Sequence, residues 1–92
     1  MKHYDWDELK NAQLKAERHV CFEDVWMAIN ENRVLDNTAH HDQIRYPHQR
    51  LLVVEINNYA YVVPYVEDNE KIFFKTIIPD RKATKKYMKG EK

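Results

Sequence analysis

Apolar residues in the first third of the chain recur at helical spacing. Positions i, i+3, i+4 and i+7 of one short segment are all apolar, which places them on a single face of an α-helix. These positions are Phe22, Val25, Trp26 and Ile29. We predict that this stripe is buried in the core against apolar residues of later segments, namely one or more of Val54, Ile56, Val62, Phe74 and Ile78.

A first helix is expected before this stripe, over residues 6–18, where sparse apolar positions indicate a surface helix with a narrow buried face. Asp5, with a glutamate three residues later, has the pattern of a capping box at its start. At the second helix, Val20 and Val25 flank a cap at Cys21 in the positions of a hydrophobic staple, although cysteine is a weak capping residue.

After residue 32 the helical spacing gives way to short runs of β-branched and aromatic residues. Four strands are predicted, over residues 34–35, 51–56, 59–66 and 72–78. Asn57 and Asn58 leave two residues for the turn between the second and third strands, and Asn tolerates the positive φ that a type I′ hairpin requires. Asp68 and Asn69 mark the next turn.

Pro64 interrupts the third predicted strand, and because proline has no N–H for the ladder, we expect a bulge or an edge position there. A short basic helix is expected after Pro79. The elements together predict an α+β fold with two N-terminal helices, an antiparallel β-meander of three to four strands and a short C-terminal helix.

The composition favours one small globular domain. Ninety-two residues suffice for a single core, so we expect residues 1–92 to form one unit. The single cysteine, Cys21, excludes an internal disulfide and a thiolate metal cluster, and we interpret it as a structural thiol rather than a nucleophile. No signal-like apolar segment or apolar run of membrane-spanning length occurs, so we expect a cytoplasmic protein that does not contact a membrane.

A net charge of zero hides a strong separation of charge along the chain. Residues 71–92 hold eight of the fifteen Lys and Arg but only two of the fifteen Asp and Glu, which gives this segment a charge of +6. The other residues carry −6. A basic segment of this kind is typical of a phosphate-binding surface, and the alternative is a solvated, frayed tail.

The segment between the first two predicted strands, residues 37–50, is long for a small domain, and such loops tend to be functional or mobile. It contains His40, His41 and His48, but adjacent histidines do not readily face one ion and no carboxylate stands at a diagnostic spacing. We therefore predict no metal and no other cofactor. Three further side chains suit RNA binding, two as hydrogen-bond donors to phosphate and one as a ring on which a base can stack. These are Arg45, Tyr46 and Arg50.

Three stretches resemble the BrnT-type toxins, a branch of the RelE/ParE-like superfamily of bacterial toxin–antitoxin systems. They are Tyr4-x-Trp6-Asp7 with Lys10 and Asn11, residues 17–25, and residues 77–84 with Tyr87. The most distinctive is the ending Arg81-x-Ala83-Thr84. The resemblance spans nearly the whole chain and implies a RelE-like fold.

The resemblance also implies a function and a partner. Such a protein is the toxin of a type II toxin–antitoxin system, a metal-independent endoribonuclease that cleaves messenger RNA and inhibits translation. Its cognate antitoxin is encoded adjacently and binds DNA, so this chain would reach DNA only through that partner. The chain departs from the family at His19, where Gly is common, at Cys21, where Ser is usual, and at Lys86, near an acid that often precedes the tyrosine. If relatives use that acid as a proton acceptor, this chain must use another group.

RNA cleavage by its own 2′-hydroxyl requires a proton acceptor, neutralisation of the charge that develops on the phosphorane, and a proton donor for the 5′-oxygen. Our candidates for these catalytic roles are Lys75, Arg81, His48 and Tyr87. Lys75 and Arg81 are assigned to the phosphorane, Lys75 on a strand face shared with Lys71 and Phe73. His48 or Tyr87 is the acid or base, and the unperturbed pKa of histidine is nearer neutrality. The remaining RNA contacts are assigned to Lys82 and Lys85.

Two other functions stay open at this point. The same superfamily fold occurs in proteins whose targets are other proteins, so the main alternative is a non-catalytic protein-binding module. A DNA-binding regulator would use residues 22–32 as a recognition helix, but that segment has three acids and no basic residue and would be repelled by phosphates. An adjacent reading frame with a ribbon-helix-helix pattern would favour the toxin, and a solitary gene would weaken it.

Overall fold

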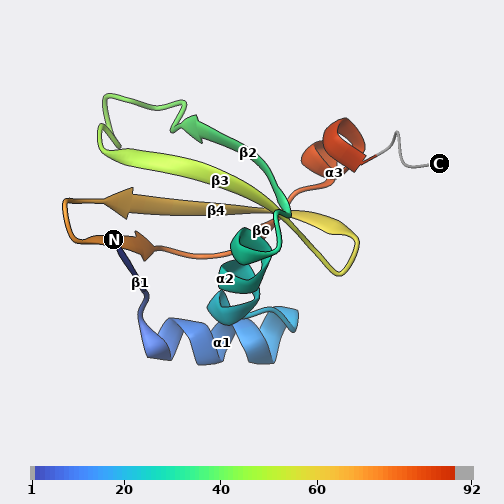
Figure 1. Ribbon diagram of the computed structural model, residues 1–92. Helices are drawn as coiled ribbons and strands as arrows, with labels where there is room; N and C mark the ends of the chain where they lie inside the picture. The colour runs from blue at the N-terminus through green and yellow to red at the C-terminus, as the bar shows by residue number, and fades with distance from the viewer. Residues whose placement is uncertain (1, 89–92) are drawn as a thin grey trace.

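The computed structural model describes residues 2–88 of the chain, and within them it has three helices and six strands (Figure 1). The predicted α+β class is confirmed. The elements are β1 His3–Asp5, α1 Glu8–Arg18, α2 Phe22–Asn30, β2 Val34–Ala39, β3 Gln49–Ile56, β4 Tyr59–Glu67, β5 Lys71–Phe74, β6 Ile78–Pro79 and α3 Arg81–Met88.

All six strands belong to one sheet with the order β1-β5-β4-β3-β2, and β6 also pairs with β4. The strands β2 to β5 are antiparallel neighbours, as the meander requires, whereas β1 pairs with β5 in parallel. The sequence analysis missed β1, because a strand of three residues is too short to show a periodic pattern. The predicted strand 72–78 is two strands, β5 and β6, which pair with different parts of β4.

Pro64 occupies neither an edge nor a bulge, so that expectation is wrong. It lies in β4, between β3 and the β5–β6 side, and the β3–β4 register is unbroken on either side of the Leu51–Pro64 pair. The Pro64 carbonyl accepts a hydrogen bond of 2.8 Å from the Lys75 N–H, which lies in the gap between β5 and β6. Because the N and C=O of one strand residue point to the same side, the missing N–H falls at this gap, where the ladder is already interrupted.

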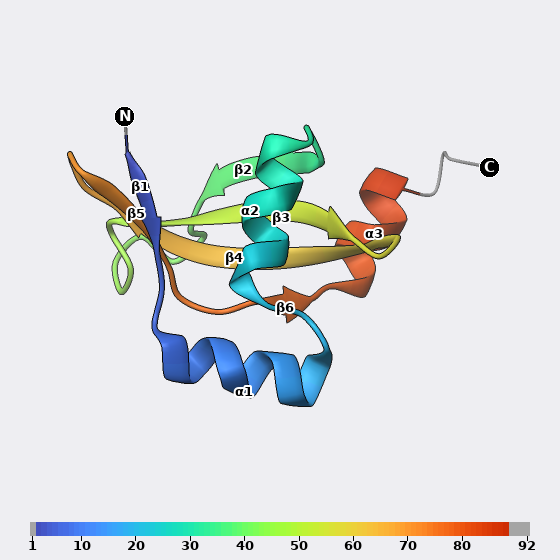
Figure 2. The same cartoon turned by 60° about the horizontal axis from the view of Figure 1, so that its bottom comes forward.

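The helices α1 and α2 cover one face of the sheet, which we call the helix-bearing face (Figure 2). Alternate residues of each strand point to this face and form the main core with the two helices. Its fully or almost fully buried members are Leu14, Val20, Phe22, Val25, Ala28, Leu52, Val54, Ile56, Val63, Tyr65, Phe74 and Ile77. The opposite face, the open face, carries Leu51, Val53, Val62 and Phe73 in the other phase of the same strands.

The predicted helical stripe is only partly correct. Phe22 and Val25 are buried as predicted, but Trp26 is 43% exposed. Ala28, which was not part of the predicted stripe, is buried in the core instead of Trp26. Ile29 packs against the core without being fully buried. The buried face of α2 therefore runs along Phe22, Val25 and Ala28. Trp26 lies beside this narrow face and stays partly exposed.

Two of the predicted partners of this stripe also lie elsewhere. Val62 belongs to a second, smaller cluster on the open face, together with Val53, Ala60 and Ala83. Ile78 pairs with Val62 and is 42% exposed. Both are in the opposite phase of strand alternation from Val54 and Phe74, so they cannot reach α2.

The helix starts are set by side chains that accept backbone N–H bonds. Asp7, and not Asp5 as predicted, is the N-cap of α1, since its carboxylate accepts the Leu9 N–H at 2.9 Å. The predicted cap at Cys21 is confirmed, and Asp24 completes the capping box by accepting the Cys21 N–H at 3.0 Å. The buried Asn11 joins the two helices, because its side-chain oxygen accepts the Phe22 N–H at 2.7 Å.

The predicted turns are present. Asn57 and Asn58 have φ of 55° and 64°, the positive values that a type I′ hairpin requires. The Asp68 carboxylate accepts N–H bonds from Glu70 and Lys71, each of 2.8 Å, in the turn before β5. His19 ends α1 with φ of 60°, a left-handed conformation that favours glycine, so the Cβ of His19 is costly there.

A stack of four aromatic rings joins the helices to the sheet. Phe22 of α2 stacks on Phe74 of β5 with a centroid distance of 6.0 Å. Tyr4 of β1 stacks on Phe74 at 5.5 Å, and Trp6, just before α1, stacks on Phe22 at 5.6 Å. The stack therefore ties β1, the start of α1 and α2 to β5.

We expect Phe22→Ala to lower the free energy of unfolding by about 3–5 kcal/mol, because it opens a cavity at the centre of this stack. Trp26→Ala is the matched control, a larger truncation on the same helix that should cost only about 1 kcal/mol, since Trp26 is 43% exposed. Urea denaturation of both variants measures the difference. Equal losses would contradict this arrangement of α2.

Candidate nucleic-acid interface

Within residues 2–88, the only helix on the open face is α3, which packs at one end of it (Figure 1). Between this helix and the strands runs a groove of about 340 Å³, which we call the α3 groove. Its floor is the apolar strand surface and its walls are polar or charged. The lining residues are Asp36, Thr38, Leu51, Val53, Val62, Asp80, Lys82, Ala83, Lys86 and Tyr87.

The position of α3 is fixed by bonds to β4. Ala60 accepts the Asp80 N–H at 3.0 Å, and its own N–H donates to the Thr84 hydroxyl at 2.9 Å. The Asp80 carboxylate accepts the Ala83 N–H at 3.0 Å and so caps the helix. Ala83 is buried, and a larger side chain there would push the helix away from the sheet. The Ala83-Thr84 part of the family-like ending therefore has a structural role.

All four basic residues of α3 are exposed, but only Lys82 and Lys86, which are one helical turn apart, line the groove. The sequence analysis assigned the phosphate to Arg81 and gave Lys86 no role. Which of the basic residues of α3 line the groove depends on the direction of their side chains. That direction is set by how this helix of eight residues packs on the sheet.

Tyr87 anchors the end of α3 to the edge strand β2. Its hydroxyl donates a hydrogen bond to Asp36, and the Lys86 Nζ lies 5.2 Å from the centroid of its ring. This bond lowers the pKa of the Asp36 carboxyl below its ordinary value and raises the pKa of the Tyr87 hydroxyl above its own. Tyr87 is therefore protonated at neutral pH, which suits a proton donor and not a base. The sequence analysis missed Asp36, since the predicted strand ended at residue 35.

Lys75 lies on the open face, as predicted, with Lys71 and Phe73. The Nζ atoms of Lys71 and Lys75 are 5.9 and 5.8 Å from the centroid of the Phe73 ring, one on either side along the strand. Lys71 also pairs with Asp5 at 3.5 Å. Lys71, Phe73 and Lys75 lie on the same face of the sheet as the α3 groove, but they do not line it.

The other predicted RNA-binding side chains lie far from α3. Residues 40–48 form the loop between β2 and β3, at the end of the sheet opposite α3 (Figure 1). His48 is exposed there, about 10 Å of strand from Leu51, the nearest groove residue of β3, and about 16 Å from Val53, which pairs with Asp36, at roughly 3.3 Å per residue. His48 and Tyr87 are therefore not brought together.

Within this loop, the predicted stacking ring already has a partner. Tyr46 packs against His40 with a centroid distance of 4.6 Å, and His40 stacks on His41 at 4.5 Å. Arg45 is exposed and pairs with Asp42 at 4.0 Å. These contacts give the loop a defined local structure of its own.

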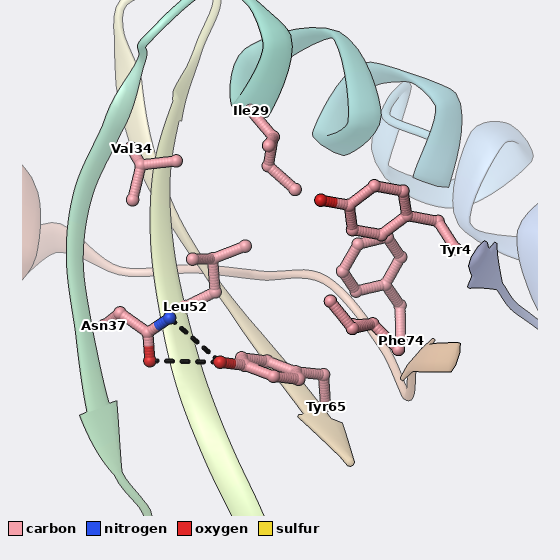
Figure 3. A pocket seen from close by; sticks show the side chains of 8 residues that line it. Tyr4, Ile29, Val34, Asn37, Leu52, Tyr65 and Phe74 are labelled. Atoms are coloured by element: carbon pink, nitrogen blue, oxygen red, sulfur yellow. Dashed lines mark hydrogen bonds between the residues drawn. The ribbon is translucent and has the colours of Figure 1, made fainter. Parts of the chain in front are cut away.

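Arg50 points to the helix-bearing face, where its Nε donates to the Asn37 side chain at 3.0 Å. Beside it lies a second hollow of about 190 Å³ (Figure 3). Its lining is mostly apolar, and its polar atoms include Asn37 bonded to the Tyr65 hydroxyl. The lining residues are Tyr4, Ile29, Val34, Asn37, Leu52, Tyr65, Ile72 and Phe74. None of them is basic, so this hollow suits an apolar group and not a phosphate.

The part of the chain that the structure describes has no group of three or more His, Cys, Asp or Glu side chains placed to hold a metal ion. Burial raises the pKa of the Cys21 thiol, which disfavours the thiolate that a nucleophile requires. Among residues 2–88, no helix combines the length and the apolar character needed to cross a membrane. Lys89 and Lys92, which contribute to the basic segment, lie outside the described residues.

Comparison with known proteins found no matching family model, no similar curated protein and no similar solved structure.

The Asp36–Tyr87 bond makes a testable contribution to stability. Because the folded-state pKa of Asp36 is lowered, its contribution is present at neutral pH and is lost as pH falls below about 4. We expect Asp36→Asn to flatten part of the acid decline in the melting temperature. Tyr87→Phe should flatten it less, because the Asn37 N–H still donates to Asp36 at 2.8 Å. The double variant should add nothing further. An unchanged acid decline in Tyr87→Phe would show that this bond is not its source.

Proposed function

We propose that this chain is a metal-independent endoribonuclease of the BrnT kind, with a RelE-like arrangement, that acts as the toxin of a type II toxin–antitoxin system. The observation that carries the proposal is the α3 groove, in which Lys82 and Lys86 face an apolar strand surface that is open to a chain-like ligand. The resemblance of the sequence supports the same class. The α3 groove is the proposed RNA site.

The charges at this groove support a phosphate ligand. The acids that line it are already engaged, Asp80 in capping α3 and Asp36 in accepting the Tyr87 hydroxyl. Among the described residues, Lys82 and Lys86 form no ion pair within 4.0 Å. Residues 71–88 carry six Lys and Arg against the single acid Asp80. Basic side chains that are not in ion pairs gain most from phosphate, because binding releases the counterions of the nucleic acid.

The proposed chemistry needs no metal, because the nucleophile is the 2′-hydroxyl of the RNA itself. A water molecule takes the proton of this hydroxyl, its oxygen attacks the adjacent phosphorus, and the bond to the 5′-oxygen breaks. The products are a 2′,3′-cyclic phosphate and a 5′-hydroxyl. Lys82 and Lys86 are proposed to stabilise the charge on the phosphorane. Tyr87 is proposed to donate the proton to the leaving 5′-oxygen, for which its hydroxyl would turn from Asp36 toward the RNA.

These roles revise our sequence-based assignment. Arg81 and Lys85 are exposed on α3 outside the groove lining, where they would bind flanking phosphate, and Lys75 would bind phosphate further along the open face. His48 has no role in this site. Catalysis would rest chiefly on charge stabilisation, which is commonly the largest single contribution to enzymatic rate enhancement.

The proposed partner is an antitoxin with an acidic segment that covers α3 and the groove. The excess of basic residues in this part of the chain would attract such a segment at long range and exclude RNA once it is bound. The antitoxin would supply the DNA binding. The alternative function, a non-catalytic protein-binding module, is favoured by the apolar hollow of about 190 Å³ on the other face, which suits a bulky apolar side chain of a protein partner.

We expect Lys82→Ala and Lys86→Ala each to lower the rate of RNA cleavage by about 10²-fold, because each removes a positioned charge from the groove. Arg81→Ala should cost less, since Arg81 is exposed and does not line the groove. The measurement is cleavage of a labelled single-stranded RNA in EDTA, with thermal melts of each variant.

Lys15→Ala is the matched control, because it removes one charge from an exposed position of α1 on the helix-bearing side. It should cleave like the wild type. Wild-type rates of cleavage in both groove variants would refute the proposed site. If the wild type cleaves RNA without EDTA but not in its presence, the metal-independent chemistry is refuted.

The biological role has a separate test. Induced expression of the wild type in a bacterium should stop growth together with loss of intact messenger RNA, and the Lys82→Ala/Lys86→Ala double variant should do neither at the same soluble level. Growth and RNA integrity are followed in the same culture. Arrest of growth with intact RNA in the wild type would favour the protein-binding alternative.

A further inference from the structure

Phe73 has an environment that its neighbours in β5 do not share. Ile72 and Phe74 point to the helix-bearing face and pack in the main core, so Phe73 points to the open face. It is partly exposed there and belongs to neither apolar cluster. A core role therefore does not account for an aromatic ring at this position.

Two ammonium groups flank this ring. Lys71 and Lys75 stand two residues before and after Phe73, so strand alternation puts all three on one face. Their Nζ atoms lie 5.9 and 5.8 Å from the ring centroid. An exposed aromatic ring between cations is the combination that single-stranded nucleic acid uses, since a base stacks on the ring and its flanking phosphates meet the charges.

The position of the ring suits a strand that also occupies the α3 groove. Phe73 pairs with Val66, and Val62 of the same strand β4 lines the groove. Four residues of strand at roughly 3.3 Å each separate the two points by about 13 Å. This is the length of about four stacked nucleotides at 3.4 Å each.

We propose that Phe73, between Lys71 and Lys75, is a stacking site for one unpaired base of the RNA whose phosphate backbone lies in the α3 groove. This inference rests on the proposed function and narrows its substrate to single-stranded RNA. A paired base has both faces covered by its neighbours in the duplex and cannot lie on the ring. Because every base has a π-face, the site holds the strand without selecting its sequence.

The test uses an oligouridine with 2′-O-methyl groups, which cannot be cleaved, and a hairpin duplex of equal length. Phe73→Leu keeps an apolar side chain but removes the ring, and should weaken single-strand binding by about 5- to 150-fold. Phe73→Tyr keeps the ring and should bind like the wild type. Lys75→Ala should reduce the slope of log affinity against log salt by about 0.7, whereas Phe73→Leu should leave that slope unchanged.

Tyr59→Leu is the control for loss of an aromatic ring, since Tyr59 lies at the hairpin on the helix-bearing face, and its affinity should match the wild type. Phe73→Trp gives an independent readout, because stacking should quench the added indole beyond any change that RNA causes in the Trp6 and Trp26 emission of the wild type. Thermal melts check that each variant is folded.

Equal affinity of Phe73→Leu and wild type, no added quenching in Phe73→Trp, or duplex binding as tight as single-strand binding would each overturn the stacking site while leaving the cleavage proposal intact. Absence of any RNA binding or cleavage by the wild type would overturn both. Loss of binding to an acidic peptide in Phe73→Leu, without loss of RNA binding, would assign this surface to a protein partner instead.

Discussion

The stack of Phe22 on Phe74 is the contact on which the rest of the structure depends. It fixes α2 against β5, and through Tyr4 and Trp6 it also holds the parallel strand β1 and the start of α1. Because both N-terminal helices are thereby committed to one face, the other face carries only α3 among the described residues. The open face that we assign to RNA is thus a consequence of how the core is packed.

The small helix α3 converts this open face into a groove. It is held by Ala60, Asp80 and Thr84, so the exposed Lys82 and Lys86 are presented by a helix whose own position is set by hydrogen bonds. The Ala83-Thr84 part of the Arg-x-Ala-Thr ending therefore serves to hold α3 on the sheet. Asp80, Ala83 and Thr84 hold α3 on the sheet, whereas the proposed RNA contacts are made by Lys82 and Lys86. These two lysines can therefore change without loss of the fold.

Features governed by local sequence were predictable. The helix from residue 22, the Asn57-Asn58 hairpin and the grouping of Lys71, Phe73 and Lys75 follow from spacing, positive φ and strand alternation. Features governed by long-range contacts were not. The Asp36–Tyr87 bond joins residues that are 51 positions apart, and the parallel β1 depends on pairing with a strand near the other end of the chain. His48 and Tyr87 are compatible in chemistry, but His48 lies in the β2–β3 loop and Tyr87 on α3, and these two elements are at opposite ends of the sheet (Figure 1).

RNA is proposed to lie along the open face from Phe73 to the α3 groove. The most direct test is a titration of the isotopically labelled protein with a non-cleavable single-stranded RNA, followed by the chemical shifts of its backbone amides. The account predicts shifts at Val62, Phe73 and Lys82 and in the strand residues between them, with the amides of α1 and α2 unchanged. Shifts confined to the loop 40–48, or to the helix-bearing face around Tyr65, would contradict it.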